Sequence, residues 1–279
     1  YEKENIFNRI LSDLKNPRQA LSGNENKLNK NKYNIFPLIQ SKDSDQLCFL
    51  NSDIHSSSYV IKCEEFGVPQ ARHRVILLGV RSDLKDTPEP IQNNFNENYI
   101  PLWDVISGMP KIRSKTSKEK DSTKNWAKSL QCILKEKWFK DLPNTYLKKE
   151  ISNVLMNFKV NNKTKAYSYK PYRGKHKTLE NWFNDKHLLN TCNHESRGHI
   201  VKDLHRYLYA ACFAGVNGVS PTLNDFPREL LPNHDNVKEA LIGTKFNDRF
   251  RVQLKNKPST TIVSHISKDG PYYIHTDTY

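Results

Sequence analysis

The sequence has no apolar run long enough to cross a bilayer. Its longest apolar stretches, 75–80 and 207–216, fall well short of the ~20 residues that a membrane-spanning helix requires. It also has no leader in which a charged segment, an apolar segment and small residues follow one another. We therefore expect a soluble, cytoplasmic protein without a membrane partner. Its 279 residues suffice for one large domain or two ordinary ones.

An initiator methionine is missing too, so we expect the chain to be a piece of a longer protein. Cysteine is scarce: the five cysteines, without paired short spacings, predict reduced thiols instead of a disulfide framework. One group has the composition of a zinc site, and it consists of Cys192, His194, His199, His205 and Cys212. Only two of its histidines have a spacing close to that of zinc ligands. Ordinary helix and loop positions are the favoured interpretation, and we expect no metal.

Acidic residues are rare in one part of the chain. Residues 111–177 hold 19 basic and 5 acidic residues, a net charge of +14, whereas the remainder has 25 of each. We call residues 111–177 the cationic block. Its segregated charge predicts a localised electropositive surface for a polyanion, and phosphate binding explains it better than mere solubility does. Aromatic residues interleave the block: Trp126, Trp138, Phe139, Tyr146, Phe158, Tyr167, Tyr169 and Tyr172.

Apolar spacing predicts the main helices. Within residues 5–14 the apolar residues fall on one helical face, and Asn16-Pro17 ends that helix. A second apolar face, Trp126, Leu130, Ile133, Leu134 and Trp138, predicts that these aromatic rings pack beneath a basic helix. A third helix is expected over about 199–213, and its inward residues are Ile200, Leu204, Leu208 and Ala211.

Strands are predicted at both ends of the chain. Residues 58–62 read as a short strand, 66–69 as a turn and 75–80 as a buried strand, because both of its faces are apolar. This order of helix, strand, turn and strand is typical of an α/β layered architecture. A polar, proline-containing linker at 87–98 follows. Short strands at 250–254, 260–264 and 272–276, with a turn at 268–270, close the chain.

A polar comb precedes the predicted buried strand. In an extended chain Gln70, Arg72 and Arg74 project to one side while the residues between them point away. Guanidinium groups bind planar acceptors and phosphates through two hydrogen bonds, so the comb suits an anionic or carbonyl-bearing ligand. A pair of surface salt bridges to Glu64 and Glu65 is an equally good interpretation from the residues alone.

Residues 67–80, Gly-Val-Pro-Gln-x-Arg-x-Arg followed by an apolar run, resemble the eighth sequence block of the cytosine-5 DNA methyltransferases. Stretches 5–17, 193–199 (NHESRGH), 203–208, 226–234 and 249–270 resemble, in this order, a bacterial, Dcm-like branch of that family. The resemblance implies a Rossmann-like domain that binds S-adenosylmethionine and a target cytosine that is flipped out of duplex DNA. In the family a cysteine thiolate attacks ring carbon six, a glutamic acid engages the ring nitrogen, and carbon five takes the methyl group.

The resemblance also implies roles for single residues. Arg74 would contact the carbonyl oxygen of the flipped cytosine, with Arg72 and Gln70 organising the site and a nearby phosphate. Thr261 would touch backbone phosphate. In the recognition region, phosphates would be held by Arg113, Lys115, Lys124, Lys128, Arg173, Lys175 and Lys177.

Two further arginines are candidates for contacts with the site or the DNA backbone. Arg197 and Arg206 each have an acidic neighbour, Glu195 and Asp203 respectively. A salt bridge to that neighbour is the favoured role for either.

Several family elements are absent. No cysteine of the chain follows a proline, and there is neither a Phe-x-Gly-x-Gly cofactor loop nor a Glu-Asn-Val motif. We therefore expect an internal slice of such an enzyme. Residues 1–95 would be part of the catalytic domain, 96–257 a mixed α+β target recognition domain, and 258–279 a β segment that returns to the catalytic domain. The cofactor pocket would lie mostly outside this chain, which alone would transfer no methyl group.

The expected partner is double-stranded DNA in the bacterial nucleoid. The missing catalytic part, as a separate chain, or a cognate restriction endonuclease are further candidates. Two other interpretations remain open. The chain is a stand-alone specificity module or subunit, or it is a nuclease with His194, His199 and Asp203 as metal ligands. Against the nuclease, the chain lacks the clustered carboxylates of two-metal enzymes.

Overall fold

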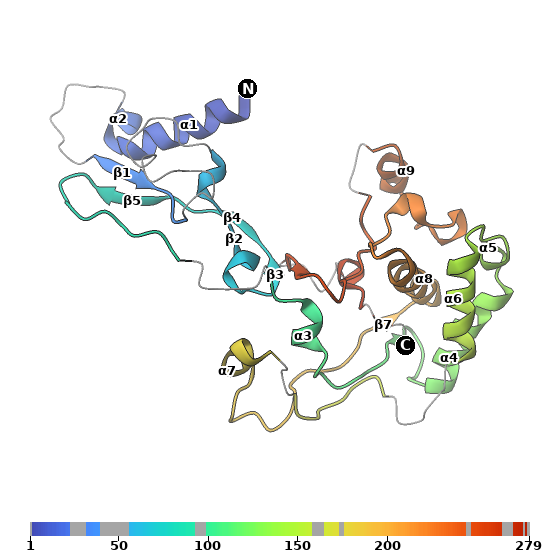
Figure 1. Ribbon diagram of the computed structural model, residues 1–279. Coiled ribbons are helices and arrows are strands. Elements are labelled where there is room, and N and C mark those ends of the chain that lie inside the picture. Colours follow the sequence, from blue (N-terminus) through green and yellow to red (C-terminus); the bar gives the residue numbers. More distant parts are fainter. Residues whose placement is uncertain are drawn as a thin grey trace. The chain divides into compact units, whose positions relative to one another are not determined.

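The computed structural model describes residues 2–22, 32–39, 56–92, 99–157, 165–172, 176–243, 247–263, 270–275 and 277. Helices and strands are mixed and short, and the chain divides into two compact units, Tyr1–Tyr99 and Ile100–Tyr279 (Figure 1). The division falls just after the predicted linker. The finer split into 1–95, 96–257 and 258–279 stays a prediction.

The first unit begins with the predicted amphipathic helix. Helix α1 (Glu2–Lys15) buries Leu11, and its Phe7 ring lies 5.5 Å from the ring of Tyr59. It ends at Lys15, and α2 (Pro17–Ser22) starts with a proline, which is tolerated in the first turn of a helix because its missing N–H has no partner there. The helix is thus confirmed, but three residues of its predicted apolar face are exposed: Ile6, Ile10 and Leu14.

The strands of this unit form two antiparallel pairs. Strand β1 (Tyr33–Phe36) pairs with β5 (Leu78–Arg81), and β2 (Val60–Lys62) pairs with β4 (His73–Val75). The remaining elements of the unit are the 3-10 helices Ser56–Tyr59 and Cys63–Phe66 and strand β3 (Gln70–Ala71). Helix α1 packs on β1. The sequence pattern predicted no strand at the position of β1.

The expectation of one buried strand over 75–80 is wrong. Strand β4 ends at Val75 and β5 begins at Leu78, and the side chains of Val75 and Ile76 are 55% and 42% exposed. The chain changes partner at this point, because β4 pairs with β2 whereas β5 pairs with β1. Between them, the N–H of Ile76 donates to the carbonyl of Tyr59 at 3.1 Å. The predicted strand at 58–62 is likewise shorter, because its first part is a 3-10 helix.

The turn at 66–69 is confirmed. Gly67 closes the 3-10 helix Cys63–Phe66 with φ of +80°, a left-handed conformation that costs glycine no steric strain. This turn brings the chain into β3 and hence into the polar comb.

Helix α8 (Val201–Asn217) is the centre of the second unit. It buries Leu204, Leu208 and Ala211, and α4 (Thr123–Gln131) and α6 (Thr145–Met156) pack against it. The predicted helix over 199–213 is therefore confirmed, with one correction. Ile200 precedes the first turn, has an extended backbone and is 50% exposed, so it does not point inward.

The predicted tryptophan face is also confirmed. Trp126, Leu130, Ile133 and Trp138 are all buried, and Leu134 packs against the same core. The face runs over α4, the 3-10 helix Cys132–Lys135 and α5 (Lys137–Lys140). The buried rings hold these three short segments against α8 and leave their lysines outside.

The other elements of the second unit are short. They are α3 (Leu102–Ile106), β6 (Lys115–Thr116), α7 (Glu180–Phe183), β7 (Gly198–His199), α9 (Asp235–Leu241), β8 (Ser259–Thr260), and the 3-10 helices Lys177–Leu179, Leu223–Asp225, Arg228–Leu230 and Gly270–Tyr273. Strands β6 and β7 are parallel neighbours. No helix within the described ranges is long and apolar enough to span a membrane.

The strands predicted at the end of the chain are reduced. Instead of two strands, 250–254 and 272–276 share one parallel bridge, between Val252 and Ile274. Strand β8 covers only the start of the stretch predicted at 260–264. Residues 264, 268, 269 and 276 of these predictions lie outside the described residues.

Candidate functional site

The polar comb lies at the start of β4. Gln70 is in β3, Arg74 in β4, and Arg72 between them. Arg74 is exposed, and its Nη1 donates to the carbonyl oxygen of His73 at 2.6 Å. Arg72 is half-buried, and within the described ranges its guanidinium makes no hydrogen bond or ion pair. Most N–H groups of the two guanidiniums therefore have no protein acceptor in this part of the chain.

The two upstream acids are bound by other residues. Nε2 of His73 lies 2.6 Å from Oε1 of Glu64, and Nζ of Lys62 lies 3.6 Å from Oε1 of Glu65. The salt bridges from the arginines to these acids, which the sequence left open, do not form among the described residues. This leaves the guanidiniums available to a ligand.

The cationic block has a buried aromatic base and an exposed basic surface. Trp126, Trp138 and Phe139 are buried in the core of the second unit. The exposed lysines of the loop before α4, of α4–α6 and of their connecting segments are Lys118, Lys120, Lys124, Lys128, Lys135, Lys137, Lys140 and Lys149. Long, exposed lysines on short rigid helices are suited to contacts with a polyanion.

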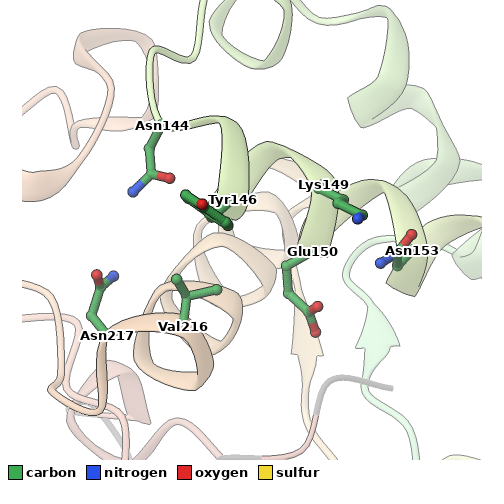
Figure 2. Close-up of a pocket in the computed structure, with 7 residues that line it drawn as sticks. All are labelled: Asn144, Tyr146, Lys149, Glu150, Asn153, Val216 and Asn217. Atoms are coloured by element: carbon green, nitrogen blue, oxygen red, sulfur yellow. The ribbon is translucent and has the colours of Figure 1, made fainter.

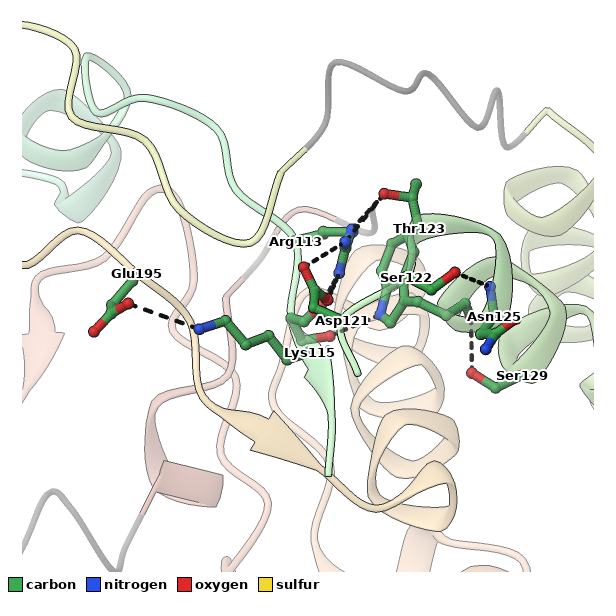
Figure 3. Close-up of polar contacts among 10 residues, drawn as sticks. Arg113, Lys115, Asp121, Ser122, Thr123, Asn125, Ser129 and Glu195 are labelled. Atoms are coloured by element: carbon green, nitrogen blue, oxygen red, sulfur yellow. Dashed lines mark hydrogen bonds and ion pairs between the residues drawn. The ribbon is translucent and has the colours of Figure 1, made fainter. Parts of the chain in front are cut away.

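Arg113 does not belong to that surface. Its side chain is 2% exposed and holds both carboxylate oxygens of Asp121, with Nη1–Oδ1 at 2.8 Å and Nη2–Oδ2 at 2.9 Å (Figure 3). It also donates to Oγ1 of Thr123 and to the carbonyl of Ser114, and its guanidinium lies 5.6 Å from the centre of the Trp126 ring. A phosphate cannot reach a guanidinium buried in this way, so the predicted phosphate contact is corrected to a structural role.

The other predicted phosphate contacts fall into three groups. Lys124, Lys128 and Lys177 are exposed. Lys115 is partly exposed on β6 and pairs with Glu195 at 3.7 Å (Figure 3). Arg173 and Lys175 lie outside the described residues.

The remaining predicted contacts lie elsewhere in the second unit. Arg197 is exposed, and Glu195, its expected partner, pairs with Lys115. Arg206 is buried, with Nη1 at 2.5 Å from Oδ1 of Asp203, which confirms the salt bridge expected for it. Thr261 follows β8, is half-buried, and its carbonyl accepts a hydrogen bond of 3.1 Å from the hydroxyl of Tyr273.

Sequence analysis gave no separate role to an exposed aromatic pair in the block. The rings of Tyr167 and Tyr169 are 43% and 48% exposed, with centres 5.7 Å apart. Nζ of Lys165 lies 5.6 Å from the centre of the Tyr167 ring. Exposed rings beside cations are suited to stacking on bases. The sequence of residues 165–170, Lys-Ala-Tyr-Ser-Tyr-Lys, places these two tyrosines between lysines. Spacing alone, however, does not distinguish them from the buried aromatic residues of the block.

A cavity of about 670 Å³ lies within the second unit. Its floor is apolar and comes from α4 and α8: Trp126, Leu130, Leu204, Leu208 and Ala211. Its walls come from residues 103–114, 194–199 and 273–277. A concave, mainly apolar surface with a few polar groups is the usual form of a ligand pocket.

Two histidines of this cavity are in contact with other residues of its lining. Burial lowers the pKa of His199, whose ring centre lies 5.1 Å from that of Tyr207 in an edge-on contact. Burial raises the pKa of Tyr207 to about 12. Nε2 of His194 is 2.6 Å from the carbonyl oxygen of Pro110.

The ligand sets suggested for zinc or for a nuclease do not come together. No group of three or more His, Cys, Asp or Glu side chains in the described ranges is placed to hold a metal ion. Asp203 instead binds Arg206, and His205 contacts the carbonyl of Ser129 at 2.8 Å. Cys212 is buried in the core.

A second, polar hollow of about 520 Å³ lies between α6 and the end of α8 (Figure 2). Its lining carries three amides, a lysine and a tyrosine among Asn144, Tyr146, Lys149, Glu150, Asn153, Val216 and Asn217. Two of the amides are already used in the protein: Oδ1 of Asn144 caps α6, and Nδ2 of Asn217 donates to the carbonyl of Phe213. Tyr146, which lines this hollow, is 79% exposed.

The described glycines do not form a cofactor loop. Gly67, Gly218 and Gly243 have positive φ, and each follows a helical segment. The loop that cradles a nucleotide cofactor in a Rossmann-like domain follows a strand. The described part of the chain therefore does not fit the S-adenosylmethionine site that the resemblance implies.

Comparison with known proteins gives two matches. The family model described as C-5 cytosine-specific DNA methylase matches residues 21–251. Type II methyltransferase M.NgoFVII of Neisseria gonorrhoeae is 34% identical over 116 residues, which are 38% of this chain and 31% of that protein. The chain thus spans less than a third of the length of that relative, and no solved structure matches it. Since the family match covers most of the sequence, the chain belongs to the C-5 cytosine-specific DNA methylases, a family that uses S-adenosylmethionine and implies an α/β methyltransferase fold.

Proposed function

We propose that this chain is part of a DNA (cytosine-5)-methyltransferase, which transfers a methyl group from S-adenosylmethionine to carbon 5 of a cytosine flipped out of duplex DNA. The observation that carries the proposal is the family match over residues 21–251. The name of the gonococcal relative, a type II methyltransferase, favours a role in restriction and modification. The protein would act in the bacterial cytoplasm on nucleoid DNA, beside a cognate restriction endonuclease.

The comb would act on the flipped cytosine. Arg74 is exposed and has N–H groups left over from its one hydrogen bond to the backbone of His73. A guanidinium with free N–H groups can donate to the carbonyl oxygen of a pyrimidine. In our proposal Arg74 makes this contact, and Arg72 and Gln70 organise the site and the nearby phosphate.

The cationic block would hold the duplex. Exposed Lys124, Lys128 and Lys177 would bind phosphates, and Arg173 and Lys175 remain candidates for the same task. Lys115, Arg197 and Thr261 are proposed as further backbone contacts. Arg113 is excluded from this set because it is buried against Asp121.

This chain alone would bind DNA without methylating it. No cysteine of the sequence follows a proline, and burial raises the pKa of the Cys212 thiol to about 12. That thiol is protonated at neutral pH and cannot serve as a nucleophile, because the thiolate is the reactive form. The nucleophile and the cofactor loop would belong to another part of the enzyme.

Two measurements test the proposal. The chain is titrated with a labelled duplex at increasing salt, and incorporation of labelled methyl groups into DNA is measured for the chain and for the full-length gene product. We expect salt-sensitive binding by the chain and methyl transfer by the full-length product alone. Absence of duplex binding at low salt would refute the recognition role.

Arg74 is tested in the full-length product. Arg74→Ala should abolish most methyl transfer while duplex binding persists. The control is Arg81→Ala, an exposed arginine at the end of β5 that is paired with Asp83. If the full-length product binds DNA and transfers no methyl group, the chain is a specificity module and the enzymatic role is wrong.

A further inference from the structure

His73 lies between the two arginines of the comb, and the proposed function gives it no task. It is the first residue of β4, and Arg74 is the second. Successive side chains of a strand point to opposite faces, so His73 projects away from the face that carries Arg74. In the pairing with β2, His73 is opposite Lys62, whereas Arg74 is opposite Ile61. Any contact of the His73 ring therefore forms on the side of the strand away from the guanidinium of Arg74.

The ring of His73 is bound to an acid in the connection between β2 and β4. Its Nε2 lies 2.6 Å from Oε1 of Glu64, which belongs to the 3-10 helix Cys63–Phe66. A carboxylate can only accept a hydrogen bond, so Nε2 is the donor. The side chain of Glu64 is 15% exposed, and its Oε2 is buried without a hydrogen-bond partner in the described ranges. The contact with His73 thus ties this carboxylate, and with it the 3-10 helix, to β4.

The backbone of His73 holds the guanidinium of Arg74. Nη1 of Arg74 donates to the carbonyl oxygen of His73 at 2.6 Å. A donor approaches a carbonyl oxygen near the plane of the peptide, so the orientation of this peptide decides where the guanidinium lies. Just before it, the N–H of Cys63 donates to the carbonyl oxygen of Arg72 at 3.1 Å. His73 therefore connects Glu64, through its ring, to Arg74, through its carbonyl group.

The neighbouring acid makes a contact of a different kind. Nζ of Lys62 lies 3.6 Å from Oε1 of Glu65, and both side chains are exposed. Exposed pairs of this length contribute little, because solvent and salt screen them. The contact between His73 and Glu64 is shorter and its carboxylate is less exposed, so it restricts the geometry more strongly.

We propose that His73 is a positioning residue of the methyltransferase: its contact with Glu64 fixes the peptide that holds Arg74, and so orients this guanidinium toward the target cytosine. The inference rests on the proposed function, which assigns Arg74 to the carbonyl oxygen of that cytosine. A misplacement of about 1 Å in a reacting complex can lower its rate by about 10²-fold. Loss of the contact should therefore slow methyl transfer and leave the binding of the duplex to the cationic block unchanged.

The test uses the full-length product. His73→Leu removes the donor and Glu64→Ala removes the acceptor, and each should lower kcat about tenfold while KM for the duplex stays unchanged. His73→Gln keeps an N–H donor and Glu64→Gln keeps a carbonyl oxygen, so both should retain most of the activity. Thermal unfolding reports whether each variant has folded. Because the two losses break one contact from its two ends, either can replace the other.

Glu65→Ala is the matched control. Glu65 follows Glu64 in the same 3-10 helix, and its replacement breaks only the exposed pair with Lys62. The kcat and KM of this variant should equal those of the wild type.

A second measurement distinguishes positioning from a merely structural role. Arg74→Ala removes the guanidinium, and its residual methyl transfer is measured in single turnovers. If His73 acts through Arg74, His73→Leu should lower the rate when Arg74 is present and have no further effect in the Arg74→Ala background. General damage to the fold would lower the rate in both backgrounds.

The outcomes are distinct. A lower kcat with an unchanged KM, confined to enzymes that retain Arg74, supports the proposal. A wild-type kcat in both His73→Leu and Glu64→Ala, a change in KM alone, or an equal loss in the Arg74→Ala background overturns it. In each of these cases methyl transfer by the wild type still supports the methylase assignment. If the wild-type product transfers no methyl group, the proposed function itself is refuted, and the inference with it.

Discussion

The guanidinium of Arg113 binds the carboxylate of Asp121 through two parallel hydrogen bonds of 2.8 and 2.9 Å. The arginine side chain is 2% exposed, whereas the carboxylate is 36% exposed. Further bonds to Ser114 and Thr123 fasten the segment before β6 to the first turn of α4. Arg113, the most buried of the described cations of the cationic block, thus holds in place the helix that carries two of the proposed phosphate contacts.

Arg113→Lys should destabilise the protein without a direct effect on DNA. Lysine cannot reproduce the two-pronged geometry, and partners left unsatisfied in a buried site cost about 1–3 kcal/mol. Chemical denaturation should show this decrease in the free energy of unfolding. Arg81→Lys is the control, because Arg81 and Asp83 are both exposed, and it should leave the unfolding free energy nearly unchanged. Unchanged stability together with weaker duplex binding would mean that Arg113 contacts a phosphate and has no structural role.

Lys124→Ala and Lys128→Ala should each reduce the salt dependence of duplex binding. A lysine that neutralises one phosphate releases about one counterion, so the slope of log K against log salt should become shallower by about 1 for each substitution. The slope is measured by titrating a labelled duplex at several salt concentrations. Lys238→Ala, on α9 outside the cationic block, should leave it unchanged. Equal slopes for all of these variants would mean that the face of α4 does not contact DNA.

Helices were predictable from the sequence because their information is local. In α1, α8 and the tryptophan face, apolar residues recur at three and four positions, and Leu11, Leu204 and Trp126 are buried as this spacing predicts. The strand over 75–80 failed because its composition does not show where the chain changes partner. That change depends on pairing with β1 and β2, which lie outside the predicted strand.

The sequence predicted which part of the chain is basic, but not which of its basic side chains are buried. A count of basic residues cannot distinguish Arg113, which meets Asp121 in the fold, from Lys124, which stays exposed. The cavity was not predictable at all, since its walls meet through contacts such as that between His194 and Pro110, 84 residues apart. Sequence resemblance did mark the NHESRGH stretch, although without indicating that it lines a cavity.

Gly198→Ala should destabilise the second unit. A Cβ atom at this position would lie 3.2 Å from Cα of Ser117 and 3.3 Å from the carbonyl oxygen of Thr116. Both atoms are backbone in or beside β6, so they cannot move aside as a flexible side chain would, and overpacking of this kind costs about 1–3 kcal/mol. Denaturant unfolding measures the loss.

Gly215→Ala is the matched control for that substitution. Apart from its chain neighbours and the backbone of its own helix, no atom lies within 4 Å of the added Cβ, and the position is within α8. Alanine should stabilise a helix by about 0.8–1.0 kcal/mol relative to glycine. A loss of stability in both variants, or in neither, would show that the close approach between β6 and β7 is unimportant.

Buried ionisable groups should make the protein less stable at high pH. Burial raises the pKa of Cys212 from 9.0 to about 12, and it raises those of Tyr207 and Tyr209 from 10.0 to about 12. The folded state therefore keeps these protons over a range in which the unfolded chain releases them. The stabilising contribution is complete below pH 9 and is lost as the pH rises towards 12.

Cys212→Ala isolates the contribution of the thiol. Wild type and variant are unfolded with denaturant at several alkaline pH values, and the free energy of unfolding of the variant should fall less steeply above pH 9. Part of the decrease should remain, because both tyrosines are still buried. Cys132→Ala is the control, since this cysteine is exposed instead of buried, and its removal should leave the slope unchanged. An identical slope for wild type and Cys212→Ala would mean that the thiol is not protected by burial, and the reason given for its inability to act as a nucleophile would fail with it.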